Sequence, residues 1–317
     1  MDLRGPGGPT IRDLTGWRVL ITGVTGQTGN YLAEMLLGLE RYEVWGMVRG
    51  QTLEARQRLQ EQLPKLKLVE GDLLDQGSLV RALEESLPEH IYHLGAISSP
   101  GLCWRQPALA AEVTGLGTLR LLEAVEHVFP DSDDTRLLVA GSLATHGPYG
   151  AAKSFSRAVA QDYRRRGRHV SVAVLGGHHS PRRGREFFSR KVSSGAAMIA
   201  AGLKDHLTLG NLDRFQDWGW ADDFAEALIR VMQMGVADDF IISTGKPHSA
   251  AEFVAACFGA AGLNWEERVR FDPALAQPTE PTEPLSAAPD SRLDWTPHRD
   301  LAGLAAWMVR HDRKALD

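Results

Sequence analysis

Short apolar runs alternate with longer segments of helical periodicity through the first two-thirds of the chain. Six runs of strand length lie at residues 18–22, 43–48, 67–70, 90–94, 136–140 and 170–175, and a late one lies at 240–243. Helix-compatible segments lie at 30–39, 54–63, 78–87, 115–128, 151–165 and 222–234, and an amphipathic one lies at 301–310. Strands that alternate with helices are joined by right-handed crossovers, which build a parallel sheet covered on both faces. The pattern therefore predicts an α/β protein with a doubly wound, Rossmann-type sheet.

The alternation weakens in the last third of the chain. Residues 178–211 are mixed, residues 271–291 are rich in Pro, Glu and Thr, and no internal repeat is present. We therefore expect a flexible lead-in at 1–15, a dinucleotide-binding domain over 16–175 and 217–245, and a smaller interleaved substrate lobe over 176–216 and 246–317. Ligands of such sheets bind beyond the carboxyl ends of the strands.

Composition removes several classes of protein from consideration. With 43% hydrophobic and 24% charged residues, the chain is neither disordered nor of low complexity. Its net charge of -5 excludes a basic footprint for nucleic acid. Cys103 and Cys257 are the two cysteines, too few for a disulfide framework or a zinc site, so no metal is expected. With no bilayer-length apolar run and no signal peptide, we expect a soluble, cytoplasmic protein with a small-molecule substrate.

Three glycines mark the turn after the first strand, in Gly23-Val-Thr25-Gly26-Gln27-Thr28-Gly29. Glycines close strand–helix turns in many folds, so the triplet alone is a weak signal. Between a first strand and a first helix, however, such a turn brings backbone N–H groups and a helix N-terminus to a pyrophosphate. The turn therefore predicts a bound dinucleotide.

The end of the second strand bears on the choice of cofactor. NAD-binding proteins usually carry an acid there, but this chain reads Met47-Val48-Arg49. Arg49 is suited to a 2′-phosphate, which favours NADP over NAD; the alternative is a solvated arginine. Asp72 is expected to accept a bond from the adenine amino group, unless it only closes a turn. The other strand-end residues expected at the cofactor are Leu73, Leu94, Gly95 and Ala96.

Tyr149 and Lys153 are four residues apart at the start of a predicted helix, so they share a face. The phenol of a tyrosine has a solution pKa of about 10. A nearby ammonium and a positive nicotinamide ring favour the phenolate, which makes Tyr149 a usable general base. Ser142, at the end of the fifth strand, is expected to orient the reacting hydroxyl. The implied chemistry is hydride transfer at a secondary alcohol or ketone.

These residues together resemble the extended short-chain dehydrogenase/reductase family, the NAD-dependent epimerases and dehydratases, and within it the GDP-mannose 4,6-dehydratases. The likeness runs from Val19 to the final helix, and its most specific strings are residues 21–29, 117–122, 148–153, 180–184, 209–213 and 217–219. The resemblance implies oxidation at C4 of a nucleotide sugar, removal of the acidified C5 proton, loss of the C6 hydroxyl and return of the hydride. NADP is recycled throughout.

The chain departs from this family beside the predicted base. The family has a Ser/Thr-x-Glu whose glutamate handles the C5 proton, whereas this chain has Ser142-Leu-Ala144. Only residues 143–148 stand where the family has a long loop that covers the substrate, so we expect a more open pocket. Candidate replacements for the acid/base are His146, His178 and His179, since histidine titrates in the useful range; each is also explained as a surface-loop residue.

A second departure concerns phosphate. Gln216 and Gln277 replace two arginines of the family. The Ser189–Lys191 string, in a part of the lobe that the family uses near the nucleotide base of the substrate, is kept. Glutamine carries no charge to offer a diphosphate. One hypothesis is therefore an uncharged substrate, such as a purine nucleoside, oxidised at one ring hydroxyl and dehydrated at the adjacent CH₂OH. The alternative is an ordinary nucleotide-diphosphate sugar held by the arginines of the substrate lobe, Arg214 with Arg182 or Arg183.

These features predict an NADP-dependent dehydratase or epimerase of a sugar or nucleoside. A simple ketoreductase needs only the predicted Ser–Tyr–Lys set, and a non-catalytic NADP-binding regulator is a third reading. Retention of Tyr149 and Lys153 argues against the regulator. Some family members reach a neighbour's cofactor with an arginine-rich loop after the second strand. That loop is shorter here, between Arg49 and Glu54, so we expect a homodimer.

Overall fold

The chain folds into two compact units, each built from separate stretches of sequence. The computed structural model describes residues 17–50, 53–130, 134–275 and 285–316, so the predicted lead-in lies outside the described residues. The first unit contains the chain up to Leu175 together with Ala225–Ile242 and Asp290–Trp295. The second contains Gly176–Phe224, Ser243–Pro289 and Thr296–Asp317.

A parallel seven-stranded sheet forms the centre of the first unit, in the order β11-β6-β5-β4-β1-β2-β3. β4 and β6 are buried at every position, which is typical of a sheet covered on both faces. The predicted α/β fold class is therefore confirmed. The strands are β1 (Trp17–Thr22), β2 (Tyr42–Val48), β3 (Lys67–Glu70), β4 (His90–His93), β5 (Arg136–Ala140), β6 (Val170–Leu175) and β11 (Asp239–Ile242).

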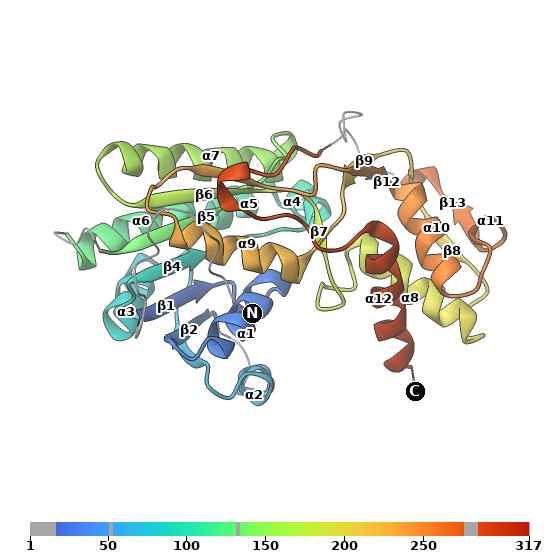
Figure 1. Ribbon diagram of the computed structural model, residues 1–317, viewed down its shortest axis with the longest axis horizontal. Helices are drawn as coiled ribbons and strands as arrows, with labels where there is room; N and C mark the ends of the chain where they lie inside the picture. The colour runs from blue at the N-terminus through green and yellow to red at the C-terminus, as the bar shows by residue number, and fades with distance from the viewer. Residues whose placement is uncertain (1–16, 51–52, 131–133, 276–284, 317) are drawn as a thin grey trace. The chain divides into compact units, whose positions relative to one another are not determined.

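Helices cover this sheet (Figure 1). Helix α3 contacts α6, and α6 contacts α7. Residues of all three helices share one hydrophobic core with the strands. The six main helices are α1 (Gln27–Gly38), α2 (Leu53–Gln62), α3 (Gln76–Ser86), α6 (Gly117–Val128), α7 (Gly147–Arg165) and α9 (Ala221–Gln233). Three short elements precede α6, namely α4 (Pro100–Arg105), α5 (Pro107–Ala110) and the π-helix η1 (Ala111–Leu116).

Two predicted helix boundaries in the first unit were wrong. The helix expected over 115–128 begins as the π-helix η1, and α7 begins at Gly147 rather than at residue 151. The earlier start of α7 has a local cause, because Gly147 adopts a φ of 69° and Pro148 occupies the first turn. Proline is well suited to that position, because a backbone N–H in the first turn has no partner within the helix and its absence costs no hydrogen bond.

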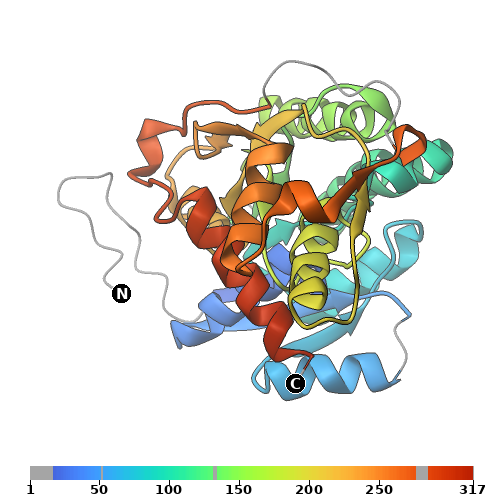
Figure 2. The same ribbon diagram turned by 90° about the vertical axis from the view of Figure 1, so that its right-hand side faces the viewer.

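The second unit is mainly helical around its own core. Figure 2, which faces this unit, shows α8, α10 and α12 lying together, and their contacts agree. Its helices are α8 (Phe188–Ala200), α10 (Ala250–Ala260), α11 (Trp265–Arg268) and α12 (Leu301–Lys314). Its strands form three pairs, β7 (His178–His179) with β10 (Gly219–Trp220), β9 (Phe215–Asp217) with β12 (Pro247–Ser249), and β8 (Leu207–Leu209) with β13 (Val269–Phe271). Short 3-10 turns are η2 (Pro273–Leu275) here and η3 (Ser291–Leu293) in the first unit.

The observed boundaries between the units differ from the predicted ranges. Residues 217–224 belong to the second unit, where Trp218 stacks on Phe253 at 4.2 Å between ring centroids. Residues 290–295, predicted for the substrate lobe, belong to the first unit, because the Asp290 N–H donates to the Ile241 carbonyl of β11 at 2.9 Å. Both differences depend on contacts distant in sequence, which local patterns do not report.

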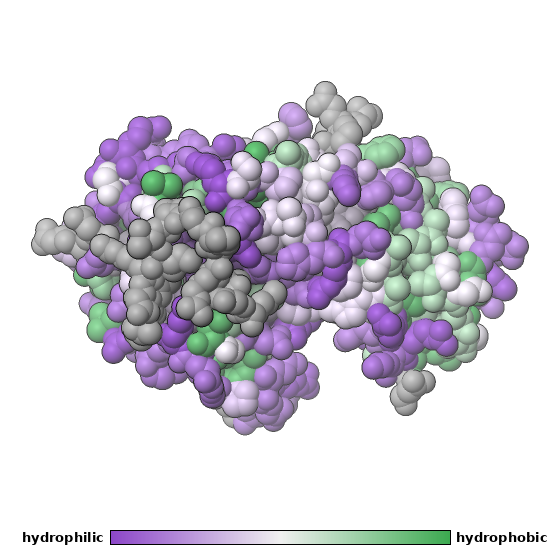
Figure 3. Space-filling model, in the orientation of Figure 1, coloured by the Kyte–Doolittle hydropathy of each residue, from purple (hydrophilic) through white to green (hydrophobic). Residues whose placement is uncertain are grey.

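Hydrophilic residues cover much of the visible face of the first unit (Figure 3). Across the described parts of the chain, every helix is too short or too polar to cross a bilayer.

His90 is a buried polar residue at the start of β4. Its side chain is 1% exposed, its ring lies 4.3 Å from that of Trp17, and neither ring nitrogen has a hydrogen-bond partner within the described residues. Burial, together with smaller contributions from the nearby Arg136 and His169, lowers the pKa of His90 to about 3. The folded chain therefore holds this imidazole neutral.

This burial predicts a loss of stability in acid. Below a pH of about 6.5 the unfolded chain binds a proton at His90, whereas the folded chain binds this proton only near pH 3. The free energy of unfolding therefore decreases as the pH is lowered from about 6.5 toward 3. Each such group contributes a slope of about 1.4 kcal/mol per pH unit. His90→Phe should remove one such slope, measured by urea unfolding between neutral and mildly acidic pH. The exposed His127→Gln is the control, and an unchanged slope in His90→Phe would contradict the account.

Candidate functional site

The turn between β1 and α1 needs glycine at the positions that the sequence marks. Gly23 adopts a φ of 73°, and a Cβ there would lie 2.8 Å from the backbone nitrogen of Gly95. A Cβ on Gly29 would overlap the carbonyl oxygen of Gly23 and lie 2.9 Å from the Cα of Val24. Side chains at these positions would push the turn away from β4 and helix α1 away from the turn.

The N-terminus of α1 fits an anionic group. Its N-cap is Gly26, which offers no side-chain cap, and the first turn of the helix contains no acidic residue. The first N–H groups of a helix have no partners within the helix and lie at the positive end of its dipole. Thr25 and Gly26 are exposed, so the turn is accessible. Backbone donors without a covering side chain suit the pyrophosphate of a dinucleotide.

This turn lies where the order of the strands reverses. β1 pairs with β2 on one side and with β4 on the other, so the crossovers diverge at the carboxyl ends of β1 and β4. Open α/β sheets bind their ligands at such a switch point. The close approach of Gly23 to Gly95 is at this point, beside the half-buried Leu94 and Ala96.

Arg49 after β2 and Asp72 after β3 differ in whether the side chain already has a hydrogen bond within the described part of the protein. Arg49 is exposed directly after β2, as a contact with a cofactor phosphate requires. Asp72 follows β3, and its Oδ1 accepts from the N–H of Leu74 at 3.0 Å. Asp72 therefore closes a turn, which is the alternative that the sequence left open, and its second oxygen is the one left to offer. Leu73 is buried.

The sequence analysis missed a series of buried, hydrogen-bonded side chains next to the turn after β1. Thr22 Oγ1 accepts from the N–H of Gly95 at 3.0 Å and lies 2.8 Å from Nδ1 of His93. The other ring nitrogen of His93 lies 3.0 Å from Thr118 Oγ1, which lies 3.1 Å from Ser156 Oγ of α7. Burial lowers the pKa of His93 to about 3, so it is a neutral hydrogen-bonding group. A histidine within an apolar strand is the signal that could have found it.

Helix α7 brings Tyr149 and Lys153 to the carboxyl end of β5. Lys153 is 7% exposed, and its Nζ donates to the carbonyl oxygen of Ala140, the last residue of β5, at 2.6 Å. Burial lowers the pKa of Lys153 to about 8, and the nearby Cys103 thiol opposes part of this shift. Tyr149 lies one turn earlier on the helix and is partly exposed. A buried ammonium and an accessible phenol thus belong to the same end of α7.

Ser142 follows β5 directly, in the same unit as α7. Its Oγ accepts from the N–H of Ala144 at 3.1 Å, which forms a turn. Ala144 is half-buried and has no group that transfers protons, so the site lacks a carboxylate at that position. His146 is the exposed N-cap of α7, and its side chain makes no capping bond.

The two predicted histidines of the second unit have structural contacts. His179 is 6% exposed, stacks on Trp218 at 4.6 Å and lies 3.1 Å from Ser189 Oγ through Nδ1. Burial holds the pKa of His179 well below its usual value. His178 is half-buried, stacks on Phe224 at 4.7 Å and bonds the Gly176 carbonyl through Nδ1 at 2.9 Å. His179 is therefore part of the core of its unit.

The predicted phosphate-binding residues of the second unit fall into two groups. Arg183 donates to the His178 carbonyl at 2.5 Å, and Arg214 lies 4.8 Å from the ring centroid of Phe188. Arg182 is exposed, and Lys191 and Gln216 are half-exposed. Burial lowers the pKa of Lys191, and the neighbouring Lys204 adds to the effect. Gln277 lies outside the described residues.

Asp217, which the sequence marked only as part of a string, is a structural centre of the second unit. It is fully buried, and its carboxylate accepts from the N–H of Thr244 at 2.8 Å, from the Thr244 hydroxyl and from Ser286 Oγ at 3.2 Å. A Cβ on Gly176 would overlap this carboxylate. Asp217 therefore lies against three stretches of the second unit, residues 176–177, 243–244 and 286–287. Each stretch lies near a point where the chain passes from one unit to the other.

Known proteins resemble this chain over nearly its whole length. The family described as GDP-mannose 4,6 dehydratase matches residues 20–308. "GDP-mannose 4,6 dehydratase 1" of Arabidopsis thaliana is 34% identical over 92% of this chain and 89% of its own length.

Solved structures share the fold at lower identity. A UDP-glucose 4-epimerase of Thermotoga maritima, solved with UDP-glucose, has a TM-score of 0.78 at 19% identity, over 95% of this chain and 100% of its own. The structure of RMD from Pseudomonas aeruginosa with NADPH has a TM-score of 0.75 at 19% identity, over 94% of this chain and 99% of its own. The chain belongs to the GDP-mannose 4,6-dehydratase family of extended short-chain dehydrogenases/reductases.

Proposed function

We propose that the protein is an NADP-dependent enzyme that transiently oxidises a ring hydroxyl of a nucleotide sugar or nucleoside and then eliminates water from the ketone. NADP, held at the glycine turn after β1, would supply the reversible two-electron oxidation of the ring carbon. Tyr149 takes the proton of the reacting hydroxyl, and Ser142 orients that hydroxyl. Lys153 binds the ribose of the cofactor and keeps a positive charge beside the phenol.

One observation carries this proposal. The Lys153 ammonium is buried at the end of β5, hydrogen-bonded to Ala140, and lies one helical turn from Tyr149. Burying an ammonium costs free energy, and a purely structural site would be filled at lower cost by an apolar side chain. Perturbed, buried titratable groups at strand ends are typical of catalytic sites. Family membership points to the same chemistry.

The proton chemistry after oxidation needs a group other than a carboxylate at position 144. A ketone acidifies the neighbouring C–H, a base removes that proton, and the hydroxyl of the next carbon leaves as water after it has received a proton from the same base. His146 is exposed and lies three residues before Tyr149. His179 is unsuited because it is buried in its own unit. We therefore favour Tyr149 or His146 as the base of this step.

A second function, simple ketone reduction, is favoured by Ala144 itself. Reduction needs a hydride from NADPH and a proton from Tyr149, and no second acid or base. The two functions differ in their product, because only elimination releases water from the substrate.

For the substrate, we propose a purine nucleoside or another uncharged sugar derivative. Gln216 and Gln277 replace two arginines that the family directs at phosphate, and each charge-assisted pair contributes roughly 1.5–3 kcal/mol. Arg183 and Arg214 already contact the His178 carbonyl and the Phe188 ring. The relatives are named for GDP-mannose, so a GDP-sugar is the alternative.

Arg49 tests the choice of cofactor. Because this arginine is exposed after β2 and no acid lies beside it, Arg49→Ala should weaken NADP binding while leaving NAD binding nearly unchanged. Calorimetric titration of each cofactor measures the effect, with the exposed Arg105→Ala as a control for general loss of charge. Equal losses for NADP and NAD would contradict the assignment.

A ligand panel tests the substrate class. GDP-mannose, GDP, guanosine and adenosine are titrated separately into the NADP-loaded protein. We expect a nucleoside to bind, and the diphosphate to add less than the roughly 1.5 kcal/mol of one charge-assisted pair. Tight binding of GDP with no detectable binding of either nucleoside would overturn the nucleoside proposal and support the GDP-sugar.

Tyr149→Phe tests the catalytic assignment. Removal of a general acid–base group typically lowers turnover 10²–10⁴-fold. We expect a loss of this size with whichever ligand of the panel reduces bound NADP, and an NADP dissociation constant close to that of the parent protein. A variant that keeps half of the parent turnover would refute the role of Tyr149.

A further inference from the structure

Helix α7 carries a second set of polar side chains beyond the proposed catalytic pair. Arg157 follows Lys153 by four residues, Gln161 follows Arg157 by four, and Arg164 comes three residues later. Residues at such spacings share one side of a helix. Lys153 therefore belongs to a continuous row of side chains that extends along α7.

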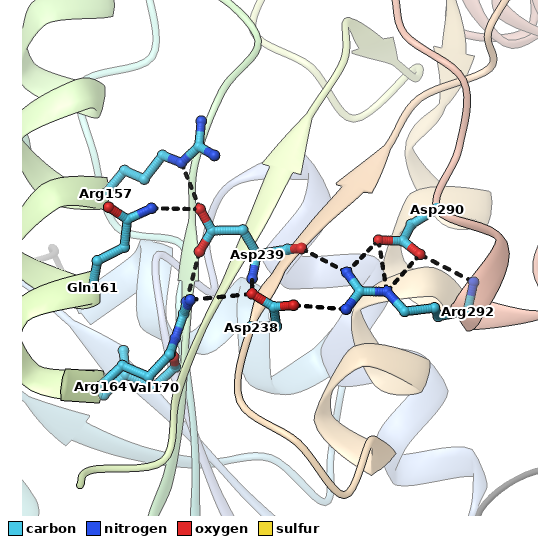
Figure 4. Close-up of polar contacts among 8 residues, drawn as sticks. All are labelled: Arg157, Gln161, Arg164, Val170, Asp238, Asp239, Asp290 and Arg292. Atoms are coloured by element: carbon cyan, nitrogen blue, oxygen red, sulfur yellow. Dashed lines mark hydrogen bonds and ion pairs between the residues drawn. The ribbon is translucent and has the colours of Figure 1, made fainter.

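These three donors converge on one carboxylate (Figure 4). Asp239, the first residue of β11, accepts at Oδ2 from Arg157 Nε at 2.6 Å and from Gln161 Nε2 at 2.8 Å. Its Oδ1 accepts from Arg164 Nη2 at 2.6 Å. Three points along two turns of helix are thus held by a single residue of the sheet.

Arg292 holds the backbone of Asp239 through a second group of hydrogen bonds. Arg292 donates to the backbone carbonyl of Asp239 at 3.0 Å and to Asp238 at 2.6 Å. It also donates to the Asp290 carboxylate through three bonds of 2.6, 2.9 and 3.2 Å. Its guanidinium also lies 4.5 Å from the centroid of the Phe240 ring. Three arginines and three aspartates balance in charge, and the network connects α7, β11 and the segment 290–295 within the first unit.

Asp239 is better shielded than a surface acid. It is 14% exposed, and although burial raises its pKa, the bonds from Arg164, Arg157 and Gln161 outweigh this and leave the pKa lowered. The carboxylate is therefore ionised at neutral pH. A network of partly buried pairs holds geometry more firmly than an isolated exposed pair does.

We propose that Asp239 is a positioning residue for the proposed reaction, fixing the rotation and axial position of α7 and so the placement of Lys153 at the end of β5. The proposal rests on the function proposed above for Lys153. A single bond would leave the helix free to roll about it, whereas three donors on one carboxylate restrain rolling and sliding together. Arg157 is one turn from Lys153, so a shift at the anchor is transmitted through hydrogen-bonded backbone to the ammonium that bonds Ala140.

The test uses Asp239→Asn, with Asp238→Asn as the matched control. Both variants remove one negative charge from adjacent positions, but among the described residues the one contact of Asp238 with α7 is that with Arg164 at 3.4 Å. The probes are NADP alone, titrated by calorimetry, and the NMR signal of Lys153 Nζ in the full chain without substrate. Thermal unfolding is measured for both variants.

We expect Asp239→Asn to shift the Lys153 Nζ signal and to raise the NADP dissociation constant roughly 5- to 10-fold, the size of a typical coupling between sites. Asp238→Asn should change neither, and Asp239→Glu, which restores the charge, should recover part of the binding. Should Asp239→Asn fail to fold, Arg157→Gln removes one donor at a half-exposed position and should shift the same signal.

An unchanged Lys153 signal and NADP affinity in a destabilised Asp239→Asn variant would overturn the proposal, since the network would then be only structural. Equal effects from both aspartate variants would overturn it as well, because charge alone would explain them. Failure of the proposed function is seen separately, in the turnover of Tyr149→Phe, and leaves the Lys153 readout intact.

Discussion

Burial of the Lys153 ammonium at the carboxyl end of the sheet is the constraint on which the site depends. Removing a cation from water costs free energy that one hydrogen bond to Ala140 only partly offsets. Such a group persists where the surrounding structure holds it in place, and here the helix that carries it is tied to the sheet along its length. In the function that we propose, contacts of Lys153 with the hydroxyls of a cofactor ribose and with a phenolate at Tyr149 offset the rest of this cost.

The glycine turn that we propose as the cofactor site lies at the same end of the sheet. Gly23 and Gly29 allow the turn after β1 to lie against β4 and α1 to begin close to that turn. His93, kept neutral by burial, joins this turn to α6 and, through Thr118 and Ser156, to α7. The glycine turn and helix α7 therefore share one hydrogen-bonded framework within the first unit.

Local signals in the sequence were enough to predict the sheet, the glycine turn and the Tyr149–Lys153 pair, because each depends on residues near one another in the chain. Helix α10 was missed for a physical reason, since its run 250–260 is apolar on most sides and shows no amphipathic period. Asp217 and Asp239 were missed because their donors lie 27 to 82 residues away along the chain. The sequence predicted His179 either at the site or in a surface loop and did not show its burial, which depends on Trp218 and Phe253, residues that the sequence does not bring together.

The most direct test of the account is the pKa of Lys153 in the intact protein. NMR titration of the lysine Nζ signals, with Lys153→Met to assign the resonance, measures it without any substrate. The account predicts that Lys153 titrates near pH 8, well below its ordinary value of 10.5, because its ammonium is buried. Titration at the ordinary value of 10.5 would show a solvated ammonium and would contradict the buried ammonium on which the proposed chemistry depends.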